Sequence, residues 1–147
     1  MSINKFNSEG YYDPTAYKAL SAIQKEERSL RAFRPIVYIC SPYSGDVDEN
    51  VAAARRYCRY AVEQGYIPIA PHLLFPQFLD DNNVKERELG LFFGNALMSK
   101  CSEVWVFGKT ISAGMEAEIR RAKWKNYKIR YFTEECEEEQ QKKPSPM

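Results

Sequence analysis

Short apolar segments alternate with helical segments along most of this chain. The predicted strands are residues 36–40, 66–70, 103–107 and 128–132. Helical periodicity covers residues 49–64, 84–99 and 113–125. Strand–helix–strand units at this spacing predict parallel strands joined by right-handed crossovers. The predicted fold is therefore α/β, with a doubly wound, mostly parallel sheet in a flavodoxin-like or Rossmann-like three-layer sandwich.

Two segments lie outside this alternation. Residues 1–33 form a predicted N-terminal helical extension, in which Asp13-Pro14 is a helix start that precedes an amphipathic pattern. Residues 134–147 are acidic and then read Lys-Lys-Pro-Ser-Pro, which predicts a disordered tail. The α/β domain itself is expected over residues 34–133. Within it, Pro68 indicates that the strand at 66–70 is an edge strand or irregular.

Charge and cysteine content exclude several classes of function. The chain has 21 Lys and Arg against 20 Asp and Glu, a net charge of +1, and no basic block, so duplex nucleic acid is not an expected partner. The four cysteines are scattered and the chain has a single histidine, so neither a metal site nor a disulfide framework is predicted. No long apolar run or apolar leader is present, which predicts a cytoplasmic protein without a membrane partner.

The strand and helix around residues 104–119 carry the clearest sign of chemistry. The strand ends in a turn of small residues, and the next helix carries Glu116 and Glu118 in its first turns. At ~100° per residue, Glu116 points outward toward Arg120, whereas Glu118 lies at the edge of the apolar stripe. Open α/β sheets bind ligands at the carboxyl ends of their strands, so Glu118 is placed to act on a substrate. The alternative is an ordinary acid that stabilises a helix start.

A second polar segment follows the first strand. Residues 41–46 read Ser-Pro-Tyr-Ser-Gly-Asp and bring backbone N–H groups, two hydroxyls and a helix N-terminus together. Such a loop suits a phosphate or another anion, although it matches no standard nucleotide-binding fingerprint. The alternative is a polar turn with a helix cap.

Three motifs in this order resemble the nucleoside 2-deoxyribosyltransferase superfamily, which includes 2′-deoxynucleoside 5′-monophosphate N-glycosidases. They are Tyr38-Ile39-Cys40-Ser41-Pro42-Tyr43-Ser44-Gly45, Pro71-His72-Leu73 and Gly114-x-x-x-Glu118-Ile119-x-x-Ala122. The resemblance covers roughly residues 34–133 and looks closest to small bacterial and phage members. It implies that Glu118 is the nucleophile of a retaining N-glycosidase that needs no metal or other cofactor. It also implies a homo-oligomer.

The resemblance assigns roles to further residues. Tyr38 would orient the nucleophile and the sugar, or else is an aromatic of the core. Ser41, Tyr43, Ser44 and Gly45 resemble the loop that holds the sugar or its 5′-phosphate. Ser112 is similar to a serine that contacts phosphate, which favours monophosphates over nucleosides. His72 would lie near the base or only pack in the loop. Gly114 and Met115 complete the predicted substrate-binding set.

The chain departs from this superfamily at Asn95. There the superfamily commonly has an aspartate that assists protonation of the leaving base, and an amide cannot donate and retake a proton. Glu88, seven residues earlier, is a candidate substitute or else a solvent-facing charge. The resemblance implies an N-glycosidase, hydrolase or transferase, acting on a nucleoside 5′-monophosphate or nucleoside. A nucleotide-binding module with little turnover, or a protein-interaction domain with aromatic loops, are the alternatives.

Overall fold

The computed structural model describes residues 14–30 and 33–140. The chain divides into two compact units, Met1–Phe33 and Arg34–Met147. In the first unit, helix α1 spans Pro14–Leu30, and its apolar residues Leu20 and Ile23 are about half exposed. In the described residues, the helices are too short or too polar to cross a lipid bilayer.

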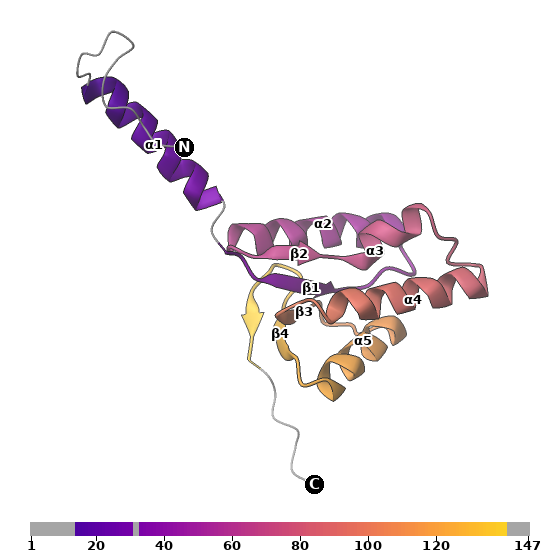
Figure 1. Ribbon diagram of the computed structural model, residues 1–147. Helices are drawn as coiled ribbons and strands as arrows, with labels where there is room; N and C mark the ends of the chain where they lie inside the picture. Colours follow the sequence, from indigo (N-terminus) through magenta and orange to yellow (C-terminus); the bar gives the residue numbers. More distant parts are fainter. Residues whose placement is uncertain (1–13, 31–32, 141–147) are drawn as a thin grey trace. The chain divides into compact units, whose positions relative to one another are not determined.

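A five-stranded sheet in the order β2-β1-β3-β4-β5 forms the centre of the second unit (Figure 1). The first four strands are parallel, and β5 is antiparallel to β4. The strands are β1 Ile36–Cys40, β2 Ile67–Ile69, β3 Glu103–Phe107, β4 Lys128–Phe132 and β5 Glu138–Glu139. The helices are α2 Val47–Glu63, α3 Pro71–Leu74, α4 Val84–Met98 and α5 Ala113–Trp124, with a 3₁₀ turn η1 at Phe75–Gln77. The predicted α/β fold with a mostly parallel sheet is confirmed, and β2, which contains Pro68, lies at an edge.

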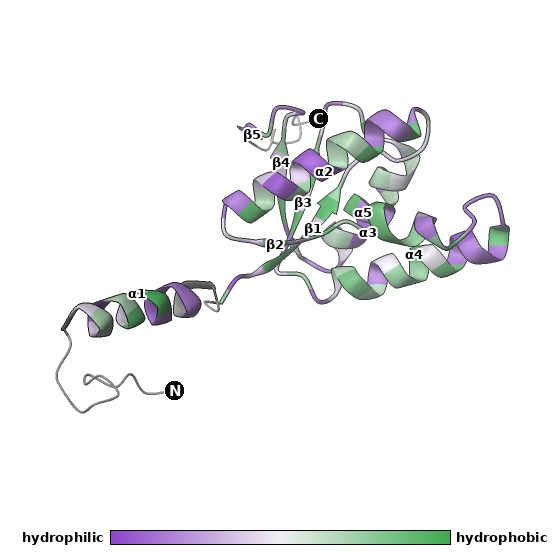
Figure 2. Ribbon diagram, turned by 90° about the horizontal axis from the view of Figure 1, so that it is seen from above, coloured by the Kyte–Doolittle hydropathy of each residue, from purple (hydrophilic) through white to green (hydrophobic). Residues whose placement is uncertain are grey.

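Alternating residues of the strands pack against helices on opposite faces of the sheet. On one face, Val37 and Ile39 belong to an apolar cluster with Tyr57 and Ala61 of α2. On the other face, Tyr38 and Cys40 of β1 pack with α5. Figure 1 shows α2 on one side of the sheet and α4 and α5 on the other. Figure 2 shows mostly hydrophobic strands and an α2 with both hydrophilic and hydrophobic residues, as expected for a helix with one face on a core.

The strand order creates a crevice at the carboxyl ends of β1 and β3. From β1 the chain continues to β2 on one side, whereas β3 lies on the other side of β1 and leads on to β4. Connections therefore diverge between β1 and β3, which is the position where open α/β sheets bind ligands. The loop after β1 and the helix after β3 both begin at this crevice.

Two predicted coil segments contain regular structure. The long loop after β2 holds α3 and η1, and Pro71 occupies the first turn of α3, where proline is well accommodated. The prediction of disorder from residue 134 is wrong for residues 134–140, because β5 pairs with β4 and Glu138 Oε2 lies 2.7 Å from Arg130 Nη2. Composition alone did not reveal that this acidic segment pairs with the strand β4 and forms an ion pair with Arg130. The rest of the predicted tail, 141–147, lies outside the described residues.

Candidate active site

Glu118 lies in the second turn of α5 and faces the end of β1. Helix α5 begins after the N-cap Ser112, whose hydroxyl oxygen accepts a hydrogen bond from the Met115 N–H at 3.2 Å. The Glu118 carboxylate is partly buried and accepts a hydrogen bond from the Tyr38 hydroxyl. The Cys40 thiol lies beside it and donates to the Met115 carbonyl oxygen, 3.9 Å from Sγ. Glu116, by contrast, is exposed and pairs with Arg120 at 3.3 Å. The opposite orientations expected for the two glutamates are confirmed.

Burial dominates the electrostatics of this cluster. Burial raises the pKa of Glu118 to about 7, although the neighbouring Cys40 and Tyr38 side chains act in the opposite direction. Burial and the neighbouring Glu118 also hold the pKa of Tyr38 well above its ordinary value. Tyr38 therefore stays protonated and donates its hydrogen bond, while Glu118 can ionise near neutral pH.

Tyr38 also lies close to the backbone of α4. A Cβ atom at Gly94 would stand 3.4 Å from the Tyr38 hydroxyl oxygen and 4.0 Å from Cβ of Pro71. The absent side chain at Gly94 thus leaves room for the phenol between β1 and α4. This close approach brings the Tyr38 hydroxyl to the pocket that α4 borders.

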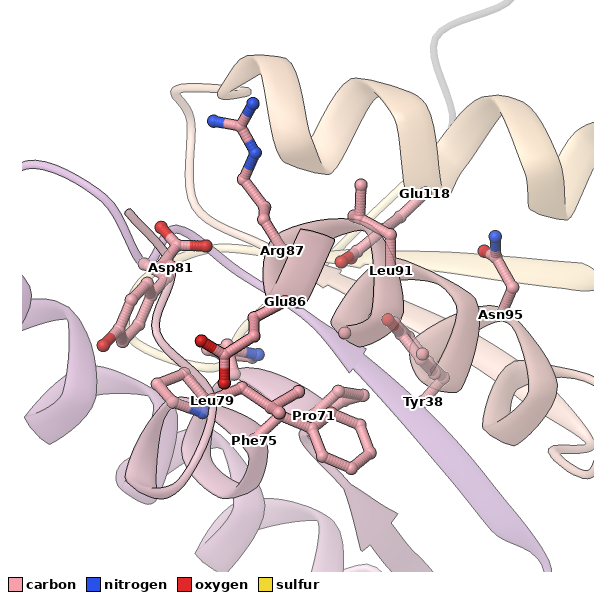
Figure 3. Close-up of a pocket in the computed structure, with 15 residues that line it drawn as sticks. Tyr38, Pro71, Phe75, Leu79, Asp81, Glu86, Arg87, Leu91, Asn95 and Glu118 are labelled. Atoms are coloured by element: carbon pink, nitrogen blue, oxygen red, sulfur yellow. The ribbon is translucent and has the colours of Figure 1, made fainter. Parts of the chain in front are cut away.

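A pocket opens above Glu118 and Tyr38, between the loop after β1, the α3–η1 segment and α4 (Figure 3). Its empty volume, which includes space open to solvent at the mouth, is about 670 Å³. Apolar side chains form much of its wall, among them Pro71, Phe75, Pro76, Leu79 and Leu91. Its polar lining residues are Tyr38, Tyr43, His72, Asp81, Glu86, Arg87, Asn95 and Glu118. Figure 3 shows Asp81 and Glu86 toward one end of the view and Asn95 toward the other.

One hydrogen bond fixes the junction between β1 and α3. Ser41 is buried, and its hydroxyl oxygen lies 2.8 Å from Nε2 of His72. Burial lowers the pKa of His72 to about 4, so the imidazole is neutral at physiological pH. A neutral ring in the pocket wall can accept or donate one hydrogen bond but offers no positive charge to a substrate.

Comparison with known proteins gives the family of this chain and a structure that shares its fold. A family model described as a domain of unknown function, DUF7768, matches residues 35–132. The chain belongs to this family. Among curated proteins, no sequence matches the chain. The DUF7768 domain is similar in structure to a 2-deoxyribosyltransferase from the psychrotolerant bacterium Bacillus psychrosaccharolyticus, with a TM-score of 0.53 and 13% sequence identity. The similarity covers 67% of this chain and 72% of that one, and it establishes the shared fold.

The DUF7768 domain brings together only part of the predicted site. Five predicted residues line the pocket, namely Tyr38, Tyr43, His72, Asn95 and Glu118. Ser41 is outside the lining, but its hydroxyl contacts the lining residue His72. Ser44 and Gly45 are exposed and lie outside the pocket lining, in a loop whose Ser44 carbonyl accepts from the Asn50 side chain at 3.1 Å.

The residues predicted at the start of α5 are also outside the lining. Ser112 caps the helix, and Gly114 is exposed beside it. Met115 is buried in the apolar cluster between the sheet and α5. These residues position Glu118 through the helix, and the geometry gives none of them a place in this pocket.

Several lining residues were missed from the sequence. Glu86 and Arg87 line the pocket because the N-terminal half of α4 runs along it, and Asp81 lines it from the loop before this helix. Helical spacing from Leu91 and Asn95 was the available signal for the helix residues, and it pointed to Glu88 instead, which is exposed and outside the lining. Cys40 was not among the predicted site residues, although it lies two residues after Tyr38 on the same face of β1. Among the described residues, no group of three or more potential ligands is arranged to hold a metal ion.

Proposed function

We propose that this domain is a cytoplasmic N-glycosidase, hydrolase or transferase, that cleaves the bond between base and sugar of a nucleoside or nucleoside 5′-monophosphate. The observation that supports it is the partly buried Glu118 carboxylate, which lies beside Tyr38 in the lining of a pocket at the end of β1. The cluster stands at the β1–β3 crevice, where ligand chemistry is expected for this strand order.

In the proposed reaction, a Glu118 carboxylate oxygen attacks C1′ of the sugar. The bond between C1′ and the base nitrogen breaks through an oxocarbenium-like transition state, and the base leaves with the electron pair and takes up a proton. The resulting glycosyl ester on Glu118 is then attacked at C1′ by water or by a second base, which frees the carboxylate. Tyr38 keeps the carboxylate oriented through its hydrogen bond.

The charges of the pocket favour a nucleoside over a monophosphate. Its lining contains three carboxylates, Asp81, Glu86 and Glu118, and one cationic side chain, Arg87. The side chains of Asp81, Glu86 and Arg87 form no hydrogen bond or ion pair with other residues of the described chain, so they can contact a substrate. An added phosphate would meet mainly carboxylates here, and repulsion in a pocket is less screened than in bulk water.

A binding module with little turnover is the second candidate. It is favoured by Asn95, because this pocket residue cannot exchange a proton with a leaving base. Such a module would bind the same nucleosides without releasing the base.

We also infer a homo-oligomer, as the resemblance to the superfamily implied. The apolar side chains of Leu89, Leu91 and Phe92 on α4 are 42%, 55% and 67% exposed beside the pocket. Burial of such residues against a second copy would remove apolar surface from water. Light scattering coupled to size-exclusion chromatography measures the mass, and a strictly monomeric protein would contradict this inference.

The decisive experiment incubates the purified full chain with a panel of nucleosides and their 5′-monophosphates. Chromatography detects released base from the wild type, Glu118→Gln and the matched control Glu116→Gln. The wild type and the control should release base, whereas Glu118→Gln should lose nearly all activity, since an amide is a poor nucleophile of almost the same shape. Equal loss in both variants would refute the nucleophile. Binding by calorimetry without any base release would favour the binding module.

A further inference from the structure

A buried hydroxyl directly after β1 is paired with the imidazole of His72. Ser41 is 7% exposed, and its Oγ atom lies 2.8 Å from Nε2 of His72. His72 lines the pocket, whereas Ser41 does not. Nε2 is therefore occupied by Ser41, and the surroundings of the other ring nitrogen, Nδ1, decide what the ring offers to a substrate.

The second ring nitrogen, Nδ1, reaches the pocket. Within residues 14–30 and 33–140, the His72 ring forms no hydrogen bond other than the one with Ser41. In the same part of the chain, no buried side-chain nitrogen or oxygen atom lacks a hydrogen-bond partner. Because Nδ1 has no partner, it is not buried, and the open space that His72 borders is the pocket.

The direction of the hydrogen bond between Ser41 and His72 decides which ring nitrogen carries the proton. Burial lowers the pKa of His72 to about 4, so the ring is neutral at pH 7 and has one proton, on Nδ1 or on Nε2. Among the described residues, Nε2 is the one hydrogen-bond partner of the Ser41 hydroxyl. A proton on Nε2 would leave the buried hydroxyl proton without an acceptor, which is unfavourable. The hydroxyl therefore donates to Nε2, and the ring proton lies on Nδ1.

We propose that Ser41 holds the proton of His72 on Nδ1, so that the pocket wall presents an uncharged N–H donor to an acceptor atom of the substrate's base. The contact with a base rests on the proposed function. Pro71 and Phe75 belong to the same segment as His72 and line the same pocket, and their apolar surfaces suit the flat faces of a base. Ser41 is then a positioning residue that acts on the substrate through His72.

An uncharged donor at this place helps the base to leave. When the bond between C1′ and the base nitrogen breaks, the electron pair moves onto the base, so the ring nitrogens and carbonyl oxygens of the base become better acceptors. A hydrogen bond from Nδ1–H strengthens as this charge develops. A neutral imidazole acts here by polarising its partner and keeps its proton, and the proton that the departing base takes up comes from solvent.

A purely structural tie between β1 and α3 is the competing role for this contact. The same 2.8 Å contact would hold α3 in place with the hydrogen bond reversed, from Nε2–H to the serine oxygen. Nδ1 would then face the pocket as an acceptor. Both directions stabilise the fold, but they place the ring proton on different nitrogens.

Nitrogen-15 NMR of the full chain distinguishes the two directions without a substrate. His72 is the single histidine of the chain, so its ring signals are assigned to a residue at once, and their couplings to the ring C–H protons distinguish Nδ1 from Nε2. At pH 7 the wild type should show a protonated Nδ1 and an unprotonated Nε2, which differ widely in ¹⁵N chemical shift. Ser41→Ala should move the two shifts toward each other, as expected for a mixture of both tautomers. Ser41→Thr keeps a hydroxyl and should retain the wild-type pattern.

The matched control is Ser99→Ala. It removes a hydroxyl that donates to the Ala96 carbonyl at 2.6 Å outside the pocket lining, so the His72 shifts should not change. Melting temperature reports the folding of each variant. A proton on Nε2 in the wild type, or an unchanged pattern in folded Ser41→Ala, would overturn the proposal.

Base release tests the contact with the substrate. With a nucleoside that the wild type cleaves, Ser41→Ala should lower kcat/KM about 2- to 10-fold, which corresponds to one neutral hydrogen bond. Ser41→Thr should restore most of this loss, and Ser99→Ala should match the wild type. An unchanged kcat/KM in Ser41→Ala, despite displaced ¹⁵N shifts, would refute the contact with the base. If no nucleoside releases base, the proposed function fails, while the ¹⁵N shifts still decide whether Ser41 holds the proton on Nδ1.

Discussion

The Ser41 hydroxyl lies 2.8 Å from Nε2 of His72 and ties the end of β1 to the first turn of α3. His72 is the single histidine of the chain, and its burial lowers its pKa from 6.5 to about 4. One wall of the pocket is therefore built on a neutral imidazole. Protonation of His72 at low pH therefore destabilises this part of the domain.

Replacing His72 by Gln should make the stability of the domain less dependent on pH. Between pH 6.5 and about 4, the unfolded chain binds a proton on His72 that the folded chain does not bind. The His72 contribution to the free energy of unfolding therefore falls as pH decreases through this window. The glutamine in His72→Gln stays neutral, so the free energy of unfolding of this variant does not fall for this reason. Urea unfolding at several pH values measures the free energy of unfolding of both proteins. The same decrease with falling pH in both proteins would contradict the prediction.

Glu118→Gln should stabilise the fold at high pH. The pKa of Glu118 is about 7 when folded against 4.5 as its ordinary value, so the folded state holds more protons between these limits. The Glu118 contribution to the free energy of unfolding thus falls as pH rises through this window. At pH 8 the variant should gain as much as ~2–3 kcal/mol, and the gain should vanish below about pH 4. Denaturation at both pH values measures the free energy of unfolding. The control Glu116→Gln, at an exposed position, should leave this free energy unchanged at both pH values.

Gly94→Ala should lower base release while leaving the fold intact. Alanine favours a helix interior over glycine by about 1 kcal/mol, but its methyl group would stand 3.4 Å from the Tyr38 hydroxyl oxygen. We expect melting temperature to hold or rise and kcat to fall about 10-fold as the Tyr38–Glu118 contact shifts. Gly90→Ala is the control on the same helix, because its Cβ would meet only the Leu79 side chain at 3.6 Å. Equal activity losses in both variants would argue against a role for the Gly94–Tyr38 approach.

Asn95→Asp should increase base release. A carboxyl group in place of the pocket amide can protonate the leaving base, and we expect a rate increase of up to about 100-fold, the low end of what general acids typically contribute. The increase should weaken as pH rises, because the introduced aspartate then stays ionised. Rates from pH 5 to 8 provide the measurement. A fast wild type that the substitution leaves unchanged would show that another pocket group, such as Glu86, donates the proton.

A nucleoside should bind at least as tightly as its 5′-monophosphate. Asp81 and Glu86 in the pocket lining repel the added phosphate, and only Arg87 attracts it. Calorimetry with Glu118→Gln measures both ligands without turnover. The double variant Asp81→Asn, Glu86→Gln should shift the preference toward the monophosphate. Much tighter binding of the monophosphate by the starting protein would restore the role predicted for Ser112 and the loop after β1.

Local sequence patterns determined the strands and the orientation of Glu118. The predicted strands at 36–40, 103–107 and 128–132 coincide with β1, β3 and β4. Helix periodicity alone distinguished Glu118 from Glu116, because the side chain's direction on a helix depends only on its position relative to the buried stripe. Strand and helix alternation likewise sufficed for the parallel sheet.

Only the tertiary structure decided which distant groups meet Glu118. Tyr38 lies beside Glu118 because β1 pairs with β3 in the sheet and α5 packs on the face that Tyr38 presents. Glu86 of α4 and Asp81 of the loop before it line the pocket because of where this segment lies in the fold, a placement that no local period encodes. The pairing of β5 with β4 also required the folded edge and Arg130. Local patterns specify which face of an element is buried, whereas contacts between elements depend on how those faces pack in space.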